Sequence, residues 1–147
     1  MDVTLALIAD AANVSRENKL NILGAFGNIN AREFPATWPR MVLVLSLEAS
    51  SAEVGTKKQL EIRILDADGA QVRTISGAFT VPSPRRPGHQ VRLNQIVQLI
   101  NVTFPHPGDY VFAVLLNGDT KREIPLTCTL LEPPPPQPGP DPPPEPA

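Results

Sequence analysis

The chain has 147 residues, a formal net charge of −2 at pH 7 and 18 prolines, ten of which lie between Pro133 and Ala147. This length predicts one folded domain, and a charge so close to zero argues against nucleic acid or an anionic membrane as the main partner. The single cysteine, Cys128, cannot form an internal disulfide and is typical of a protein in the reducing cytoplasm.

The N-terminal segment predicts a strand. Its apolar residues alternate with period two, which is the pattern of a strand with one buried face, although alanine and leucine also favour a helix. The apolar run is broken by Asp10 and lacks the positive start of a signal peptide. Residues 19–31 form the next predicted strand, in which Gly24 and Gly27 indicate a bulge or a close backbone approach.

A segment with two prolines, Phe34-Pro-Ala-Thr-Trp-Pro39, follows. Each proline holds the residue before it, Phe34 or Trp38, in an extended conformation. We expect the two aromatic side chains to plug one end of the core, because covering them gains a large burial free energy. The alternative is an exposed aromatic platform for a ligand, with Asn28 and Asn30 as its polar neighbours.

Three further strands are predicted in the middle of the chain, over residues 41–49, 60–64 and 71–81. The segment Asp66-Ala-Asp-Gly69 between the last two has the start of a calcium loop but lacks the later ligands, so it predicts a hairpin turn. In residues 89–104 the apolar positions change parity. That change indicates either a bulge or a strand that passes from one sheet to another.

Residues 105–130 predict a closing hairpin. Asn117-Gly118 is the strongest short-range hairpin signal, because a type I′ turn needs positive φ at both central residues. Alternating apolar residues flank this turn on both sides: Tyr110, Phe112, Val114 and Leu116 before it, and Ile124, Leu126, Cys128 and Leu130 after it.

About eight strands with turn signals between them predict an all-β fold, an antiparallel β-sandwich of the immunoglobulin-like kind. A closed barrel is the alternative. We assign the sandwich domain to residues 1–131 and a disordered proline-rich tail to residues 132–147. Proline runs favour the extended polyproline II geometry, so the tail is a ligand for an aromatic groove, a stiff spacer or an inert terminus.

Two segments resemble the sequences of one uncharacterised family. Lys19-Leu-Asn-Ile-Leu-Gly-Ala-Phe26, followed by Phe34-Pro35, resembles the opening of a domain-of-unknown-function family of small bacterial β-sandwich proteins. The closing hairpin of that family resembles Pro107-Gly-Asp-Tyr-Val-Phe112 with Asn117-Gly118 and Ile124-Pro-Leu126. The resemblance covers the predicted domain, implies a bacterial origin and a sandwich fold, and carries over no site residues.

No group of reactive residues points to catalysis or to a bound metal. Cys128 has the parity of its apolar neighbours, which predicts a core position rather than an activated thiolate. No pair of residues has zinc spacing, and neither a phosphate loop nor a nucleophile elbow is present. We therefore predict a protein that is not an enzyme, with no catalytic residue, no cofactor and no metal site.

The densest positive charge lies in Pro84-Arg-Arg-Pro87, with Arg92 nearby. Arg85 and Arg86 suit an acidic partner or a P-x-x-P contact, and a solvated loop is the simpler interpretation. With Phe34 and Trp38 they are the candidate partner-binding residues.

We predict a cytoplasmic protein-interaction or structural assembly module that binds a protein partner, and neither nucleic acid nor membrane. The alternative is a β-sandwich that binds a small molecule or a carbohydrate. The oligomeric state has no signature in the sequence.

Overall fold

The computed structural model describes residues 1–133, 136, 138–140 and 143–146. The predicted disordered tail, residues 132–147, includes positions 134–135, 137, 141–142 and 147. At these positions the prediction lies outside the described residues. The described chain is all-β, with a single short 3₁₀ helix, η1 (Ser51–Glu53), and none of its helices is long and apolar enough to cross a membrane. Its nine strands are β1 (Asp2–Val14), β2 (Leu20–Ala25), β3 (Asn28–Ala31), β4 (Ala36–Ala49), β5 (Lys57–Asp66), β6 (Gln71–Thr80), β7 (Val91–Phe104), β8 (Gly108–Leu116) and β9 (Asp119–Leu130).

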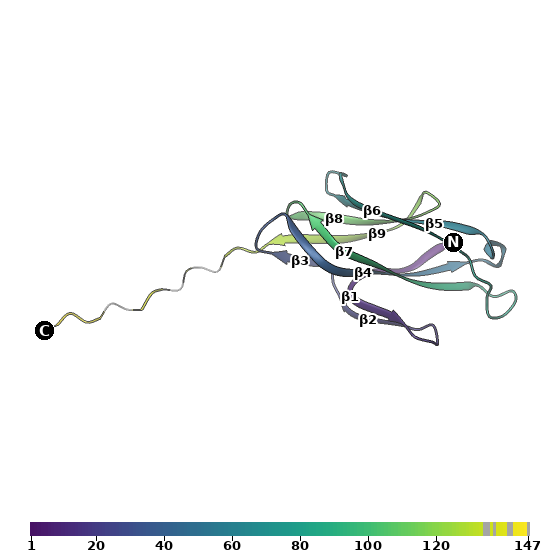
Figure 1. Ribbon diagram of the computed structural model, residues 1–147, viewed down its shortest axis with the longest axis horizontal. Coiled ribbons are helices and arrows are strands. Elements are labelled where there is room, and N and C mark those ends of the chain that lie inside the picture. The colour runs from purple at the N-terminus through teal and green to yellow at the C-terminus, as the bar shows by residue number, and fades with distance from the viewer. Residues whose placement is uncertain (134–135, 137, 141–142, 147) are drawn as a thin grey trace.

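The strands form two sheets, a four-stranded sheet in the order β2-β1-β4-β7 and a five-stranded sheet in the order β3-β9-β8-β5-β6 (Figure 1). Neighbouring strands are antiparallel except β3 and β9, which are parallel. The prediction of a wholly antiparallel fold does not hold for that pair. Residues 19–31 were predicted to be one strand, but the chain crosses between the sheets at Phe26-Gly27 and so forms β2 and β3.

The main apolar core lies between the two sheets. Alternate residues of β4, from Met41 to Leu47, join side chains of β5, β8 and β9 in one buried cluster. Cys128 belongs to this cluster, as its parity predicted. Phe34 and Trp38 are half-buried and pack against it, and the Trp38 ring centroid lies 6.2 Å from that of Phe26. The two aromatic side chains therefore cover the core.

The change of parity in β7 comes from one residue with positive φ, Asn101, and not from a bulge. Leu99 is buried, and so are Val102 and Phe104 beyond it. Between them Asn101 has a φ of 53°, which shifts the side-chain alternation by one position. The strand pairs with β4 in the same register on both sides of Asn101, so it neither contains a bulge nor passes to the other sheet, and both predicted explanations are wrong.

A second apolar cluster lies on the outer face of the four-stranded sheet. Ala9, Val42 and Val44 are buried there although the main core is on the other face. The cover comes from a hairpin arm, which we define as residues 10–25, and Leu20 of that arm packs against the cluster. In Figure 1 β1 curves back, so that its end and β2 lie beside the β4 layer. The arm thus carries the β1–β2 turn toward the start of β7.

Gly24 makes the hairpin arm possible. Its φ is +69°, and a Cβ at this position would collide with the Asp10 carboxylate on the paired strand. The positive φ favours glycine at this position, whereas the clash involves only the flexible end of a side chain. The atoms closest to Gly24 belong to the Asp10 side chain and none lies within 4 Å of a Cβ at Gly27, so the close backbone approach predicted for the two glycines is not found.

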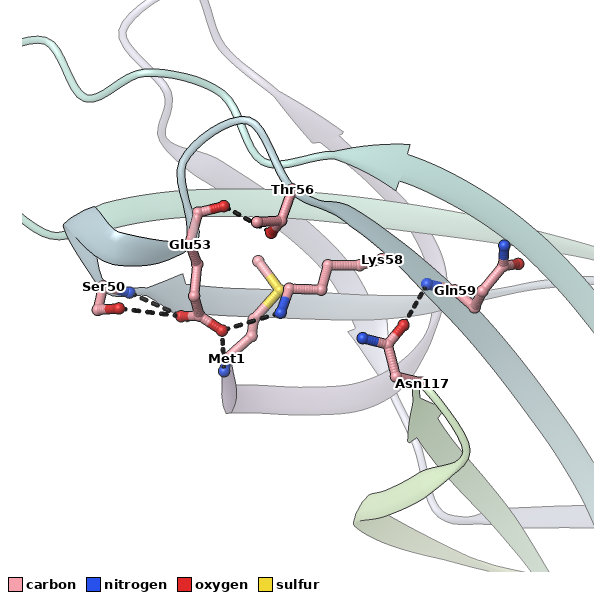
Figure 2. Close-up of polar contacts among 7 residues, drawn as sticks. All are labelled: Met1, Ser50, Glu53, Thr56, Lys58, Gln59 and Asn117. Atoms are coloured by element: carbon pink, nitrogen blue, oxygen red, sulfur yellow. Dashed lines mark hydrogen bonds and ion pairs between the residues drawn. The ribbon is translucent and has the colours of Figure 1, made fainter.

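Glu53, at the end of η1, ties three segments together (Figure 2). Its Oε1 accepts hydrogen bonds from the Met1 ammonium at 2.7 Å and from Lys58 Nζ at 3.0 Å. Its Oε2 accepts one from the Ser50 backbone N–H at 2.8 Å. These hydrogen bonds, chiefly that from the N-terminal ammonium, lower the pKa of Glu53 to about 2.

Acid should remove the stabilisation that Glu53 provides. The pKa of Glu53 in the folded chain is about 2, below the ordinary value of 4.5, so its contribution is present above pH 4.5 and is lost as the pH falls toward 2. We expect Glu53→Gln to lower the Tm at neutral pH and to differ less from the wild type as the pH falls through this window. Thermal melts across the window check this. Glu17→Gln, at an exposed pair with Lys19, is the control, and a constant gap for Glu53→Gln would contradict the assignment.

The turn at Asn117-Gly118 supplies a second prediction. Asn117 and Gly118 have φ values of 50° and +83°, as the type I′ interpretation requires, and Asn117 Oδ1 accepts a hydrogen bond from Gln59 N–H at 2.9 Å (Figure 2). Gly118→Val should lower the free energy of unfolding by at least ~1 kcal/mol, because a β-branched residue resists positive φ. Urea denaturation measures the loss. Gly77→Val is the matched control, since Gly77 lies in β6 with open space and no positive φ, and equal effects of the two variants would refute the argument.

Candidate functional site: an arginine-lined cleft

Two segments that are distant in the sequence form a cleft at one end of the four-stranded sheet. One wall is the β1–β2 turn, and the other is the loop from Pro82 to Gln90 with the first residues of β7. The cleft has a volume of about 580 Å³. Four arginines line it: Arg16, Arg85, Arg86 and Arg92.

Local hydrogen bonds give the β1–β2 wall its shape. The Ser15 carbonyl accepts a bond from Asn18 N–H at 3.0 Å, and Ser15 Oγ accepts one from Lys19 N–H at 3.1 Å. Asn18 has a φ of 60°, which asparagine tolerates well. Asn94 Nδ2 then donates to the Asn18 carbonyl at 3.2 Å and fixes the turn to β7. The turn leaves Arg16 exposed in the wall of the cleft.

The opposite wall is shaped by prolines and a glycine. Pro82 and Pro84 line the cleft, and they restrict the backbone on the approach to the two arginines. After them the His89 N–H donates to the Arg86 carbonyl at 3.3 Å, with Gly88 at a φ of +80°. This turn places Arg85 and Arg86 on the surface facing the β1–β2 turn.

The charged side chains that line the cleft are all positive. Its lining contains four arginines and His89 but neither aspartate nor glutamate. Arg92 Nε is 2.9 Å from Glu48 Oε1, whereas the other three arginines form no ion pair within the part of the chain that the structure describes. The lining of the cleft is therefore positively charged, although the net charge of the whole chain is −2. Guanidinium groups suit carboxylates or phosphates, which they bind through two parallel hydrogen bonds.

The predicted partner-binding residues separate into two places. Arg85, Arg86 and the nearby Arg92 lie together in the cleft, as their spacing suggested. Phe34 and Trp38 lie at the other end of β4, because Ala36 pairs with Phe104 while Ala49 pairs with Val91, next to Arg92. They do not contribute to the cleft.

Sequence reasoning missed Arg16 and His89. Arg16 belongs to a turn that is about 70 residues from Arg86, and no local pattern links the two. Only the fold of the hairpin arm over the sheet brings them together. His89 follows Pro87-Gly88 and was assigned to the start of the segment 89–104, with no link to the arginines.

The turn Asp66-Ala-Asp-Gly69 is a hairpin turn, as predicted. Asp66 Oδ1 accepts hydrogen bonds from the backbone N–H groups of Ala70 at 2.8 Å and Asp68 at 2.9 Å. The bond from Ala70 is the chief cause of the lowered pKa of Asp66. In the ranges that the structure covers, no three His, Cys, Asp or Glu side chains are grouped to hold a metal ion.

Cys128 should be inert in the folded chain. It is buried, and that burial raises the pKa of its thiol to about 11. We expect almost no reaction with a chromogenic disulfide reagent near pH 8 until denaturant is added, when one equivalent should react. Ser51→Cys, at an exposed position, is the control and should react at once. Rapid reaction of the native wild type would contradict the buried, protonated thiol.

Comparison with known proteins gives one family. Residues 4–129 match a family of unknown function (DUF6941). No curated protein matches.

Among solved structures, the chain is similar to the Pseudomonas fluorescens alkylpurine DNA glycosylase AlkC bound to DNA containing an abasic site analog. The identity is 21%, the match covers 70% of this chain and 27% of that chain, and the TM-score is 0.42. It is also similar to a glycosyl hydrolase family 2 member from Bacteroides cellulosilyticus. The identity is 16%, the match covers 63% of this chain and 13% of that chain, and the TM-score is 0.34. A third similar structure is a β-glucuronidase from glycoside hydrolase family 2. The identity is 16%, the match covers 63% of this chain and 11% of that chain, and the TM-score is 0.35. The chain thus spans about a quarter or less of the length of these proteins.

Proposed function

The chain belongs to DUF6941, a family of unknown function, and we propose that it is a non-enzymatic interaction module whose arginine-lined cleft binds an acidic segment of a protein partner. The observation that carries the proposal is the cleft itself. Four guanidinium groups and no carboxylate line one cavity, and three of the four have no ion-pair partner in the described chain. A bound carboxylate-rich segment would supply the missing charge.

An acidic protein segment fits this cleft better than nucleic acid does. Tight binding of nucleic acid needs many phosphate contacts and a basic domain, whereas this chain has a pI of about 5.6. Pro82 and Pro84 add apolar surface between the charges, which suits a peptide backbone and its side chains. We propose no catalytic role for the cleft, because Cys128, the candidate nucleophile, lies in the core and outside the cleft.

We also propose that the module is an immunoglobulin-like sandwich. Taking β1, β4 and β7 as strands A, B and E, and β5, β8 and β9 as C, F and G, gives the neighbour orders A-B-E and C-F-G of that fold, with no strand D among the described residues. Tyr110, near the start of β8, supports the assignment. Its hydroxyl donates to the His106 carbonyl at 2.6 Å, which is the tyrosine corner expected where strand F begins. Immunoglobulin-like folds commonly bind through loops at one end, and the cleft is built from such loops.

The aromatic alternative is weaker. A carbohydrate platform needs exposed ring faces, but Phe34 and Trp38 are half-buried and pack against the core. We therefore place recognition at the cleft. A bacterial, cytoplasmic setting remains part of the proposal, and the single reduced Cys128 supports the cytoplasmic location.

The proposal is tested with a fluorescein-labelled oligoglutamate peptide and the full chain. We expect binding in low salt, and Arg85→Gln/Arg86→Gln should weaken it by about tenfold, because each charge-assisted hydrogen bond to a carboxylate is worth more than a neutral one. Fluorescence anisotropy measures the affinity. Raising the salt to about 0.5 M should weaken wild-type binding as well.

The matched control removes two arginines elsewhere. Arg32 and Arg40 are exposed and do not line the cleft, so Arg32→Gln/Arg40→Gln has the same net charge as the cleft variant. It should bind oligoglutamate like the wild type. Equal losses in the two variants would show that only net charge matters, and that result would overturn the cleft as the binding site.

A further inference from the structure

The last part of the chain carries the charge that the cleft lacks. From Glu123 to Ala147 there is no lysine, arginine or histidine, and Glu132, Asp141 and Glu145 are acidic. The cleft has the opposite composition, with four arginines and no acid. Because proline-rich segments are already extended, they lose little conformational entropy when they bind. Residues 132–147 therefore have the chemistry of an occupant for the arginine-lined cleft.

The acidic segment and the cleft belong to opposite ends of the four-stranded sheet. Leu131, just before the segment, donates its N–H to the Ala31 carbonyl at 2.8 Å, beside the β3–β4 connection. At that end Ala36 pairs with Phe104, while the cleft lies at the other end, where Ala49 pairs with Val91. The whole length of β7 separates the two.

Distance excludes the chain's own cleft for the central carboxylate. The 14 residues of β7 extend over roughly 46 Å at about 3.3 Å per residue. Asp141 is ten residues beyond Leu131, and ten residues span at most about 36 Å even when fully extended at about 3.6 Å per residue. Even a segment that folded straight back along the sheet would leave Asp141 short of the arginines. A second copy of the chain has no such limit.

We propose that residues 132–147 of one copy bind in the arginine-lined cleft of another, so that the chain assembles head to tail. This inference rests on the proposed function of the cleft, and it names the partner as a second copy. An open assembly keeps one free segment at one end and one free cleft at the other, because the two contacting surfaces are different. Such heterologous contacts form rings when the rotation closes and open chains when it does not.

Sedimentation velocity of the full chain at about 0.1–0.5 mM in low salt tests the assembly. We expect the wild type to form species larger than dimers as its concentration rises, and about 0.5 M salt to return it to monomers. Arg85→Gln/Arg86→Gln and Asp141→Asn/Glu145→Gln should each be monomeric alone. Mixed together they should form a one-to-one dimer that grows no further, because only one intact cleft meets one intact segment. Arg32→Gln/Arg40→Gln is the control and should assemble like the wild type.

The outcomes separate this inference from the proposed function. A wild type that binds oligoglutamate through the cleft but stays monomeric at these concentrations would overturn head-to-tail assembly and leave the binding site in place. Assembly that survives in the Asp141→Asn/Glu145→Gln variant would overturn it too, since the contact would then lie elsewhere. A wild type that binds no oligoglutamate and forms only monomers would overturn both proposals.

Discussion

The hairpin arm depends on a small apolar cluster that lies outside the main core. Ala9, Val42 and Val44 are buried on a sheet face that would otherwise meet water, and Leu20 helps to cover them. Burial of apolar surface holds the arm against the sheet, and Gly24 supplies the positive φ that the backbone of the arm has at that position. Without this packing the β1–β2 turn would not reach the start of β7, and the cleft would have only one wall.

The fold could be predicted where the signals are local. The Asn117-Gly118 turn and the Asp66 turn each depend on a few adjacent residues, and the structure has both. The crossing at Phe26-Gly27 could not be predicted, because Leu20 to Ala31 has the composition of one strand. Its division is decided by β9, which pairs with β3 from a distance of about 100 residues. Tertiary pairing overrides the local pattern there.

The residues of the arginine-lined cleft could also be predicted only where the signal is local. Arg85 and Arg86 stand out in the sequence because two adjacent charges between prolines have an unusual density. Arg16 does not, because it is a single charge in a polar turn and only the arm brings it near the others. Phe34 and Trp38 were assigned correctly to the cover of the core, since large aromatic rings gain more from burial than from exposure. Their nomination as partner-binding residues finds no support from the cleft geometry.

The positive charge of the four arginines also bears on the role that we propose for the cleft. Like charges around one cavity repel each other, and of the four arginines only Arg92 has a carboxylate partner in the described chain. Glu53, in contrast, is paired with both the Met1 ammonium and Lys58. The walls of the cleft are held by backbone hydrogen bonds and by Asn94, so the shape of the cleft does not depend on its arginines. Charged groups that the fold does not need are the ones that the proposed binding of an anion would use.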